Sequence, residues 1–401
     1  MKKMYFREWG IESSRYWGLL TVLAVIVAVA GLAVFYMEHN GHWVTGMNNQ
    51  VVWGTPHVFA VFLIVAASGA LNIASIGSVF GKKIYKPLAP LSGLLSIALL
   101  VGGLAVLVLD LGRPDRLIIA MTYYNFKSIF AWNIYLYIGF LVIVVIYLWT
   151  MMERKMNGYT KAAGTFAFVW RLALTTGTGS IFGFIVARQA YDAAIYAPMF
   201  IILSFALGLA FYMLILGFAF DWDKRDFGDK LFKRLKNLMG VFVAASLYFT
   251  IAYHLTNLYG TENHEYEAFI LMDGGLYTMI FWVGQIFIGS LIPLGIIYHP
   301  ALGQSRSAIT AASLMILIGG LATMYTVIIA GQAFPMAMFP GKEIIESGFY
   351  DAGVAEYSPS LPEVALGIGG IAMALLVTVI GIRMLRFLPE TLSDKALDPH
   401  G

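Results

Sequence analysis

Residues 91–116 read LSGLLSIALLVGGLAVLVLDLGRPDR, an apolar run that ends in a cluster of charges. The run Leu91–Leu109 is about as long as the ~20 residues that an α-helix needs to cross a bilayer. Residues 109–116 then carry four charges. Gly112 and Pro114 favour the end of the helix, because glycine tolerates a left-handed cap and proline cannot continue the hydrogen-bond ladder. Charges at a bilayer edge are costly, so this segment is expected to serve chemistry or a partner.

Similar apolar runs recur along the whole chain, of which 59% is hydrophobic and only 12% charged. This composition predicts an all-α integral membrane protein with a single polytopic membrane domain over its 401 residues. About ten transmembrane helices are expected, at residues 17–37, 55–80, 87–109, 129–151, 163–188, 196–220, 237–259, 274–298, 308–331 and 361–387.

The distribution of positive charge predicts how the helices are oriented. With a cytoplasmic N-terminus, most of the 26 Lys and Arg residues fall in the inner loops and few in the outer ones. Both termini are therefore expected in the cytoplasm and residues 109–116 on the outer face. Inner basic clusters such as 230–236 are explained by this topology signal and by contact with anionic membrane lipid. No nucleic-acid partner is expected.

A weak internal repeat suggests two halves. Residues 86–90 and 100–105 (KPLAP, LVGGLA) resemble residues 299–302 and 317–322 (HPAL, LIGGLA). The match places the second and third helices over the eighth and ninth in the same direction. We therefore expect two four-helix-bundle-like halves.

Cysteine is absent from the sequence, which excludes disulfides, thiolate chemistry and cysteine-ligated iron–sulfur clusters within it. No metal site is expected. A bis-histidine haem needs two histidines at one depth on facing helices, and only His57 and His254 loosely meet that condition. No haem is expected, so any metal centre used in electron transfer must belong to another subunit.

Polar and aromatic residues gather near the charged segment and suggest a quinone site. Asp110 lies at the last turn of its helix, and His57, at the outer start of the second helix, is expected at a similar depth. A quinone needs an apolar slot with hydrogen-bonding groups for its two oxygens, and quinol oxidation needs proton acceptors. A salt-bridged helix cap without chemistry remains the alternative. The further candidate lining residues are Tyr123, Tyr124, Ser128, Trp132, Asn133 and Tyr135.

Several polar residues inside the predicted helices form a second group. The candidates for a proton relay are Asn72, Arg171, Arg188, Asp192 and His254. Charged groups at membrane depth normally face a partner or a hydrated cavity. Simpler interpretations also stand: interhelical hydrogen bonds for the polar stripe 68–75, extension of Arg171 to the inner surface, and an i,i+4 ion pair between Arg188 and Asp192.

Residues 109–116 closely resemble the signature of the NrfD/polysulfide reductase membrane-subunit family. The match extends to His57, the small-residue patch 68–70 and the turn 82–87, whereas Gly54 departs from the family pattern, which has a polar residue there. The number of helices is similar to that of the long branch of the family. Within that branch, the preferred assignment is the membrane subunit associated with dissimilatory sulfite reductase, which implies a role in sulfur metabolism.

The resemblance implies a haem-free, quinone- or quinol-interacting subunit of a respiratory complex in a prokaryotic cytoplasmic membrane, not an enzyme by itself. Electrons would pass between menaquinone or ubiquinone and a periplasmic ferredoxin-like iron–sulfur subunit. A cytochrome and further membrane or catalytic subunits are the other candidate partners. His57 and one tyrosine of the group above would contact the quinone oxygens. Arg113, Asp115 and Arg116 would contribute to docking of the partner.

Two other classes of function remain open at this point. A proton- or ion-coupled carrier would use the intramembrane charges Arg171, Arg188, Asp192 and His254. A passive membrane anchor would tolerate every substitution in the pocket. Solute uptake by liposomes without bound quinone would favour the carrier.

Overall fold

The computed structural model describes residues 4–336 and 353–397. The expected all-α membrane fold is confirmed, with only two very short strands, β1 (Phe6–Arg7) and β2 (Leu388–Pro389), in the described part. The long helices are α1 (Ser13–Asn40), α2 (Thr55–Ala70), α4 (Ala89–Leu109), α6 (Ile129–Met152), α7 (Thr160–Gly183), α8 (Tyr196–Trp222), α9 (Asp229–Tyr259), α13 (Arg306–Tyr325) and α15 (Leu361–Met384). The shorter helices are α3 (Asn72–Ser78), α5 (Leu117–Thr122), α10 (His264–Ala268), α11 (Leu276–Met279), α12 (Ile292–Tyr298), α14 (Gly331–Ala333) and α16 (Asp394–Leu397).

Helical turns of other pitch join several of these segments into continuous rods. The 3₁₀ helix η2 (Lys83–Leu88) leads into α4, and the π-helix η9 (Thr326–Ala330) connects α13 to α14. A longer π-helix, η7 (Ile280–Leu291), lies between α11 and α12. The remaining short turns are η1 (His42–Val44), η3 (Pro114–Arg116), η4 (Arg154–Tyr159), η5 (Thr261–Asn263), η6 (Phe269–Asp273) and η8 (Leu302–Gln304).

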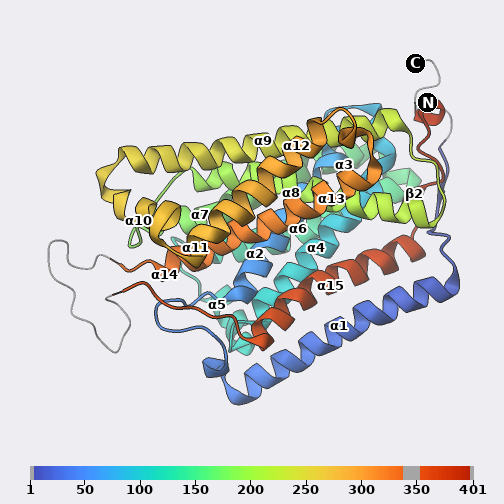
Figure 1. The fold of residues 1–401 in the computed structure, drawn as a ribbon. Helices are drawn as coiled ribbons and strands as arrows, with labels where there is room; N and C mark the ends of the chain where they lie inside the picture. The colour runs from blue at the N-terminus through green and yellow to red at the C-terminus, as the bar shows by residue number, and fades with distance from the viewer. Residues whose placement is uncertain (1–3, 337–352, 398–401) are drawn as a thin grey trace.

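The rods lie side by side along one long axis (Figure 1). The helices α5, α10 and α14 lie at one end of the bundle, and both chain termini lie at the other. Following the charge-based orientation, we call these the outer end and the inner end. Among the described residues, nine helices are long and apolar enough to cross a membrane. The tenth rod, α7, has 24 residues but includes Arg171 and a row of threonines that make it more polar.

The bundle is joined across its middle by a close contact between α2 and α8. A Cβ at Gly208 of α8 would overlap the backbone of Gly69 in α2, so only glycine allows the two helices to approach so closely. The repeated glycine pairs serve the same purpose. Gly103 of α4 faces the backbone of Ala60 in α2, and Gly319 of α13 packs on η7. The pairing of α4 with α2 therefore has a counterpart in the pairing of α13 with η7.

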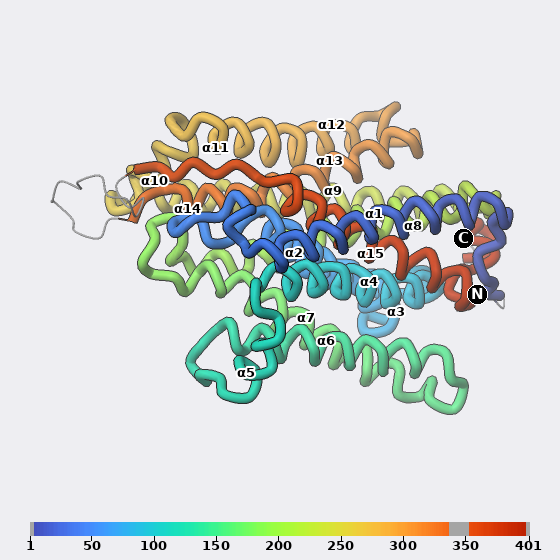
Figure 2. The backbone as a smooth tube through the Cα atoms, turned by 90° about the horizontal axis from the view of Figure 1, so that it is seen from below, coloured from blue at the N-terminus to red at the C-terminus, as the bar shows by residue number. Residues whose placement is uncertain are grey.

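The first and last long helices form a separate layer on one side of the bundle. The helix α1 packs along α15, and α15 in turn packs on α2 and α4. Figures 1 and 2 both show α1 at the edge of the molecule. Only 11% of its most apolar window is buried within the chain. Its apolar side chains therefore suit contact with lipid tails.

The observed ends of two helices differ from the sequence-based expectation. The helix expected over 163–188 ends at Gly183, whose Cα faces the carbonyl of Ala193 after the chain has turned back. The helix expected over 237–259 instead begins at Asp229, because the basic residues 230–236 continue the helix beyond the apolar segment. The early end of α7 changes the geometry of the residues that follow it.

Candidate functional site

His57 and Asp110 meet at the outer end, as their expected depths predict. Asp110 caps α4, and Gly112 follows with a φ of +68°, which confirms the predicted glycine stop. Pro56 starts α2 and places His57 in its first turn. The imidazole Nδ1 lies 2.7 Å from Oδ2 of Asp110. The carboxylate side chain is 0% exposed and the imidazole 16%, so the histidine is the reachable part of the pair.

This pair is incompletely satisfied. The two groups lie at ion-pair distance without being aligned as a hydrogen bond. Within the described residues, neither of the Asp110 oxygens nor the buried Nδ1 of His57 has a hydrogen-bond partner. Burying a carboxylate without donors is costly, and such groups occur where a ligand or a function compensates the cost. A ligand that donates hydrogen bonds would suit this site.

Aromatic rings surround His57 on one side. The indole of Trp53 stacks on the imidazole, with 6.2 Å between ring centroids and 27° between planes. Phe130 of α6 and Phe182 of α7 contact the same indole at 5.8 and 6.0 Å. These rings come from three separate segments. They give the imidazole a flat, apolar neighbourhood of the kind that planar aromatic ligands use.

The loop before α2 is fixed by Gln332, which belongs to α14. The backbone N–H groups of Val52 and Trp53 both donate to its Oε1 at 3.0 Å, and its Nε2 donates to the Trp53 carbonyl. Arg188 binds the same region by donating to the carbonyls of Gln332 (2.7 Å) and Gln50 (3.0 Å). The distant segments around residues 50, 188 and 332 thus position Trp53 and His57 together.

The predicted ion pair between Arg188 and Asp192 is wrong. An i,i+4 pair requires a helix, and α7 has already ended at Gly183. The guanidinium of Arg188 is directed to backbone carbonyls, whereas Asp192 is exposed with a φ of +51°. Arg188 is therefore placed as a support of the His57 loop, and whether either residue relays protons stays a prediction.

A buried acid from the last long helix supports the same loop. Glu363 is 0% exposed, and it accepts hydrogen bonds from the Gly46 N–H (2.8 Å) and the Tyr357 hydroxyl (2.7 Å). Tyr357 in turn accepts from the Thr55 N–H at 2.6 Å. A Cβ at Gly54 would overlap the Glu363 carboxylate. Glycine at residue 54 is thus explained, because Glu363 and Tyr357 supply polar groups at that place.

The predicted tyrosines form an exposed group on α5 and α6. The ring of Tyr124 packs edge to face on Tyr135 at 5.3 Å, and the Tyr135 hydroxyl donates to the Met121 carbonyl. Tyr123 is 86% exposed. No contact of these three rings with His57 or Asp110 is seen in the described part of the protein. Their role at a quinone stays a prediction.

Three further predicted residues lie at the start of α6. Ser128 is its N-terminal flanking residue. Trp132 stacks on Phe126 at 4.8 Å and donates to its carbonyl, so it belongs to the exposed aromatic group. Asn133 is 2% exposed, and its amide donates to the Ile129 and Gly177 carbonyls. Asn133 therefore joins α6 to α7. These three residues also stay untested as quinone ligands.

The charged residues of the signature segment lie on the outer surface. Arg113 holds Asp115 with two hydrogen bonds of 3.1 Å, and this contact lowers the pKa of the Asp115 carboxyl. Both residues and Arg116 are exposed. The outer end of α1 also reaches this turn, since His42 lies against Gly112. The arrangement leaves a charged surface beside the His57–Asp110 pair, where a partner could dock.

A second histidine–carboxylate pair lies in the other half. His254, near the outer end of α9, lies 2.7 Å from Glu267 of α10, with Nδ1 and Oε2 aligned as a hydrogen bond. The other oxygen of Glu267 accepts from Asn257 at 2.8 Å. Glu267 is 0% exposed. The sequence placed His254 in the outer half of its helix, but nothing there indicated that Glu267 is buried beside it.

The remaining relay candidates lie where α7 crosses α2. Arg171 is 1% exposed, so it does not extend to the inner surface. Its guanidinium lies between the rings of Phe168 and Phe205. Ser68 donates to the Arg171 carbonyl and Thr175 donates to Ser68, which confirms interhelical hydrogen bonding for that part of the polar stripe. The Nδ2 atom of the buried Asn72, in contrast, has no partner among the described residues.

The fold and this outer site define a multi-pass membrane protein with a histidine–carboxylate site at one end. Residues 43–336 match the family described as Polysulphide reductase, NrfD. The protein therefore belongs to this family, and the resemblance noted in its signature segment is confirmed.

Named relatives extend over nearly the whole sequence. It is 28% identical over 389 residues to the Hdr-like menaquinol oxidoreductase integral membrane subunit of Archaeoglobus fulgidus, covering 96% of this protein and 97% of the relative. It is 23% identical to a selenate reductase subunit of Mesobacillus selenatarsenatis, covering 96% and 94%. One of the polysulfide reductase chains of Wolinella succinogenes is 24% identical, with 71% of this protein and 96% of the relative covered. By their names, these relatives are parts of oxidoreductases.

Proposed function

We propose that the protein exchanges electrons between a membrane quinone and an iron–sulfur subunit docked on its outer end. The observation that carries the proposal is the pair formed by His57 and Asp110, a buried acid with unsatisfied oxygens beside a reachable imidazole. The name of the Archaeoglobus relative supports menaquinol as the substrate class. The names of the selenate and polysulfide reductase relatives support a respiratory complex, with sulfur metabolism as one setting.

Oxidation of a quinol releases two electrons and two protons. In the proposal, the His57 imidazole accepts a proton from a substrate hydroxyl, and Asp110 fixes the ring through Nδ1. Trp53 supports the face of the imidazole. Since the sequence has no cysteine, the acceptor cluster would belong to a partner, for which we propose a periplasmic ferredoxin-like subunit. A cytochrome and further catalytic subunits remain proposed partners in the prokaryotic cytoplasmic membrane.

The substitution His57→Ala tests this proposal in membranes that contain the assembled complex. Quinol-dependent reduction of the partner subunit should fall by about 100-fold or more, because a positioned proton acceptor contributes about that factor. The partner should still co-purify, since the docking surface is unchanged. His39→Ala is a matched control, because His39 is exposed on α1 and stacks only on Phe35 among the rings described. Unchanged electron transfer in the His57 variant would contradict the proposal.

A proton- or ion-coupled carrier is the second candidate. Arg171 favours it most, since this buried cation has no carboxylate partner among the described residues. Its guanidinium is nevertheless placed between two aromatic rings, which stabilise a cation without any transported ion. Solute uptake into liposomes that hold the purified protein, abolished by Arg171→Gln, would support the carrier.

A further inference from the structure

A large cavity opens at the inner end of the bundle, opposite the His57 site. Its volume is about 960 Å³, and it lies between β1, the start of α4, the end of α6, the start of α7 and the end of α15. These elements are ends of membrane-spanning helices and the strand packed beside them. The cavity therefore lies at the level of the lipid headgroups on the side that the charge pattern assigns to the cytoplasm.

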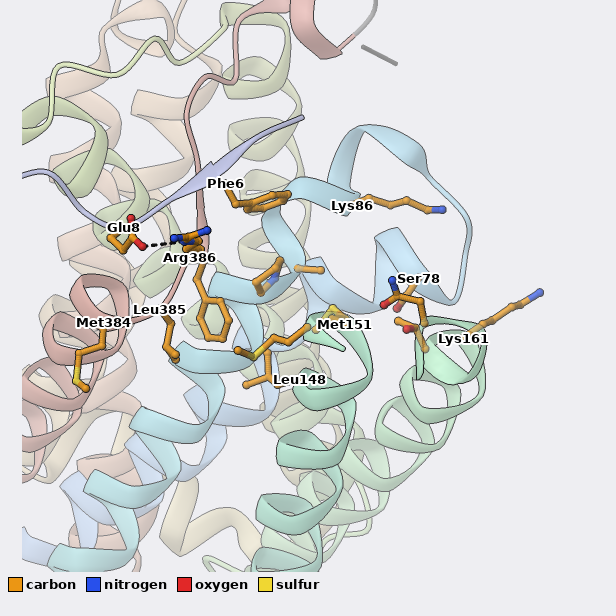
Figure 3. Close-up of a pocket in the computed structure, with 16 residues that line it drawn as sticks. Phe6, Glu8, Ser78, Lys86, Leu148, Met151, Lys161, Met384, Leu385 and Arg386 are labelled. Atoms are coloured by element: carbon orange, nitrogen blue, oxygen red, sulfur yellow. Dashed lines mark hydrogen bonds and ion pairs between the residues drawn. The ribbon is translucent and has the colours of Figure 1, made fainter. Parts of the chain in front are cut away.

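The wall of the cavity toward the membrane is apolar. Leu148, Met151 and Met152 from α6 face Met384 and Leu385 from the end of α15. Figure 3 shows Leu148 and Met151 against the helices, at a distance from the charged groups of the rim. Methionine side chains adapt to irregular apolar ligands, which suits acyl chains.

The rim of the cavity is positively charged. Lys86 and Lys161 line it from two different helical segments, and both are exposed. Figure 3 shows both side chains extending on the same side of the cavity. Neither lysine has a carboxylate partner in the described residues. Their aliphatic stems can follow the apolar wall while the ammonium groups stay near water.

The acid that lines the cavity does not cancel this charge. Glu8 is bound by Arg386 at 2.8 Å, and the guanidinium holds the pKa of the Glu8 carboxyl below its usual value. Glu8 and Arg386 therefore neutralise one another and leave the charge of the two lysines uncompensated. The nearby hydroxyls are also occupied, because Ser78 binds Tyr147 and Thr160 donates to the Thr150 carbonyl.

We propose that this cavity binds an anionic phospholipid of the inner leaflet, with the phosphate at Lys86 and Lys161 and an acyl chain along Met151. Charge, an apolar wall and depth in the membrane all agree with this class of ligand. Because the hydroxyls have other partners, recognition depends on the negative charge and not on the rest of the headgroup. The inference does not rest on the proposed quinone function.

The test is a titration of the purified full-length protein in neutral detergent with fluorescent phosphatidylglycerol. The double variant Lys86→Gln/Lys161→Gln should bind about 30-fold more weakly, since each basic residue contributes to attraction of an anionic lipid. Met151→Trp should also weaken binding, because it fills the cavity without changing charge. The control Lys224→Gln/Lys233→Gln removes two exposed lysines that do not line the cavity, and it should bind as the unmodified protein does.

Three outcomes would overturn the proposal. Equal affinity in the Lys86→Gln/Lys161→Gln variant would show that the rim does not bind the headgroup. Equal binding of phosphatidylcholine would show that negative charge is not recognised. Displacement of the lipid by glycerol 3-phosphate or by a short-tail naphthoquinone would assign the cavity to a soluble phosphate or to a quinone instead.

Discussion

Two histidine–carboxylate pairs in this protein have the same separation but different surroundings. His57 and Asp110 lie 2.7 Å apart in one half, and His254 and Glu267 lie 2.7 Å apart in the other. Both carboxylates are 0% exposed. Glu267 is fully used, since His254 and Asn257 each bind one of its oxygens. Asp110 has no such donors among the described residues.

This difference indicates which pair serves a ligand. A buried carboxylate that is saturated with hydrogen bonds stabilises the fold and has little capacity for anything else. A buried carboxylate with free oxygens reduces stability unless something binds it. The comparison therefore assigns a structural role to His254–Glu267 and substrate binding to His57–Asp110. Substitutions in the two pairs should have opposite consequences.

The largest effect is expected on stability, for Glu267→Ala. Removing this carboxylate leaves His254 and Asn257 buried without partners, which should lower the free energy of unfolding by about 3–5 kcal/mol. Thermal unfolding of the purified protein, followed by circular dichroism, measures this loss. Glu265→Ala is the control, because Glu265 is exposed on the same short helix. A melting temperature equal to that of the control would remove the structural role from the comparison.

Asp110→Asn should have the opposite profile. Quinol turnover should fall by about 100-fold, because the amide cannot hold His57 in the same charge state and orientation. Stability should change by less than about 1 kcal/mol, since the buried charge that is lost had no hydrogen-bond donors to lose. Turnover and thermal unfolding are measured on the same preparations, with the exposed Asp115→Asn as control. A large loss of stability with normal turnover would reverse the assignment.

Gln332→Ala should affect binding more than chemistry. The glutamine side chain holds Val52 and Trp53 through three hydrogen bonds, so its loss should loosen the ring that stacks on His57. We expect KM for quinol to rise about tenfold with little change in kcat. Gln304→Ala, in an exposed inner turn, provides the control. A lower kcat at unchanged KM would place Gln332 in the chemical step instead.

The smallest effect on the protein itself is expected for Arg113→Ala/Arg116→Ala. These side chains are exposed, and exposed ion pairs contribute only about 0–1 kcal/mol to stability. Quinone binding by the isolated protein should remain, whereas co-purification of the partner subunit should be lost. Survival of both co-purification and electron transfer would remove this surface from the docking site.

The apolar runs and charges predicted much of the fold and the centre of the site. Long apolar segments fix where helices lie, because the bilayer demands both their length and their composition. The proximity of His57 and Asp110 followed from depth alone, since one starts an outer helix end and the other finishes one. Gly112 was identified because few other residues adopt its positive φ.

The supporting contacts could not be predicted in the same way. Gln332 and Glu363 reach the loop before α2 from nearly 300 residues along the sequence, and no local pattern indicates such a contact. Glu267 looked like one of several loop acids until the fold buried it beside His254. Arg188 and Asp192 were paired by helical spacing, which failed because tertiary packing ended α7 at Gly183.

The most direct test of the central claim is the affinity of the purified protein for a water-soluble naphthoquinone. Quenching of tryptophan fluorescence measures it, because Trp53 stacks on His57. His57→Asn should weaken binding by at least about tenfold, the effect of losing one hydrogen bond to a buried ligand. His254→Asn, measured on folded protein, should leave the affinity unchanged. Equal weakening by the two variants, or weakening by His254→Asn alone, would contradict the account.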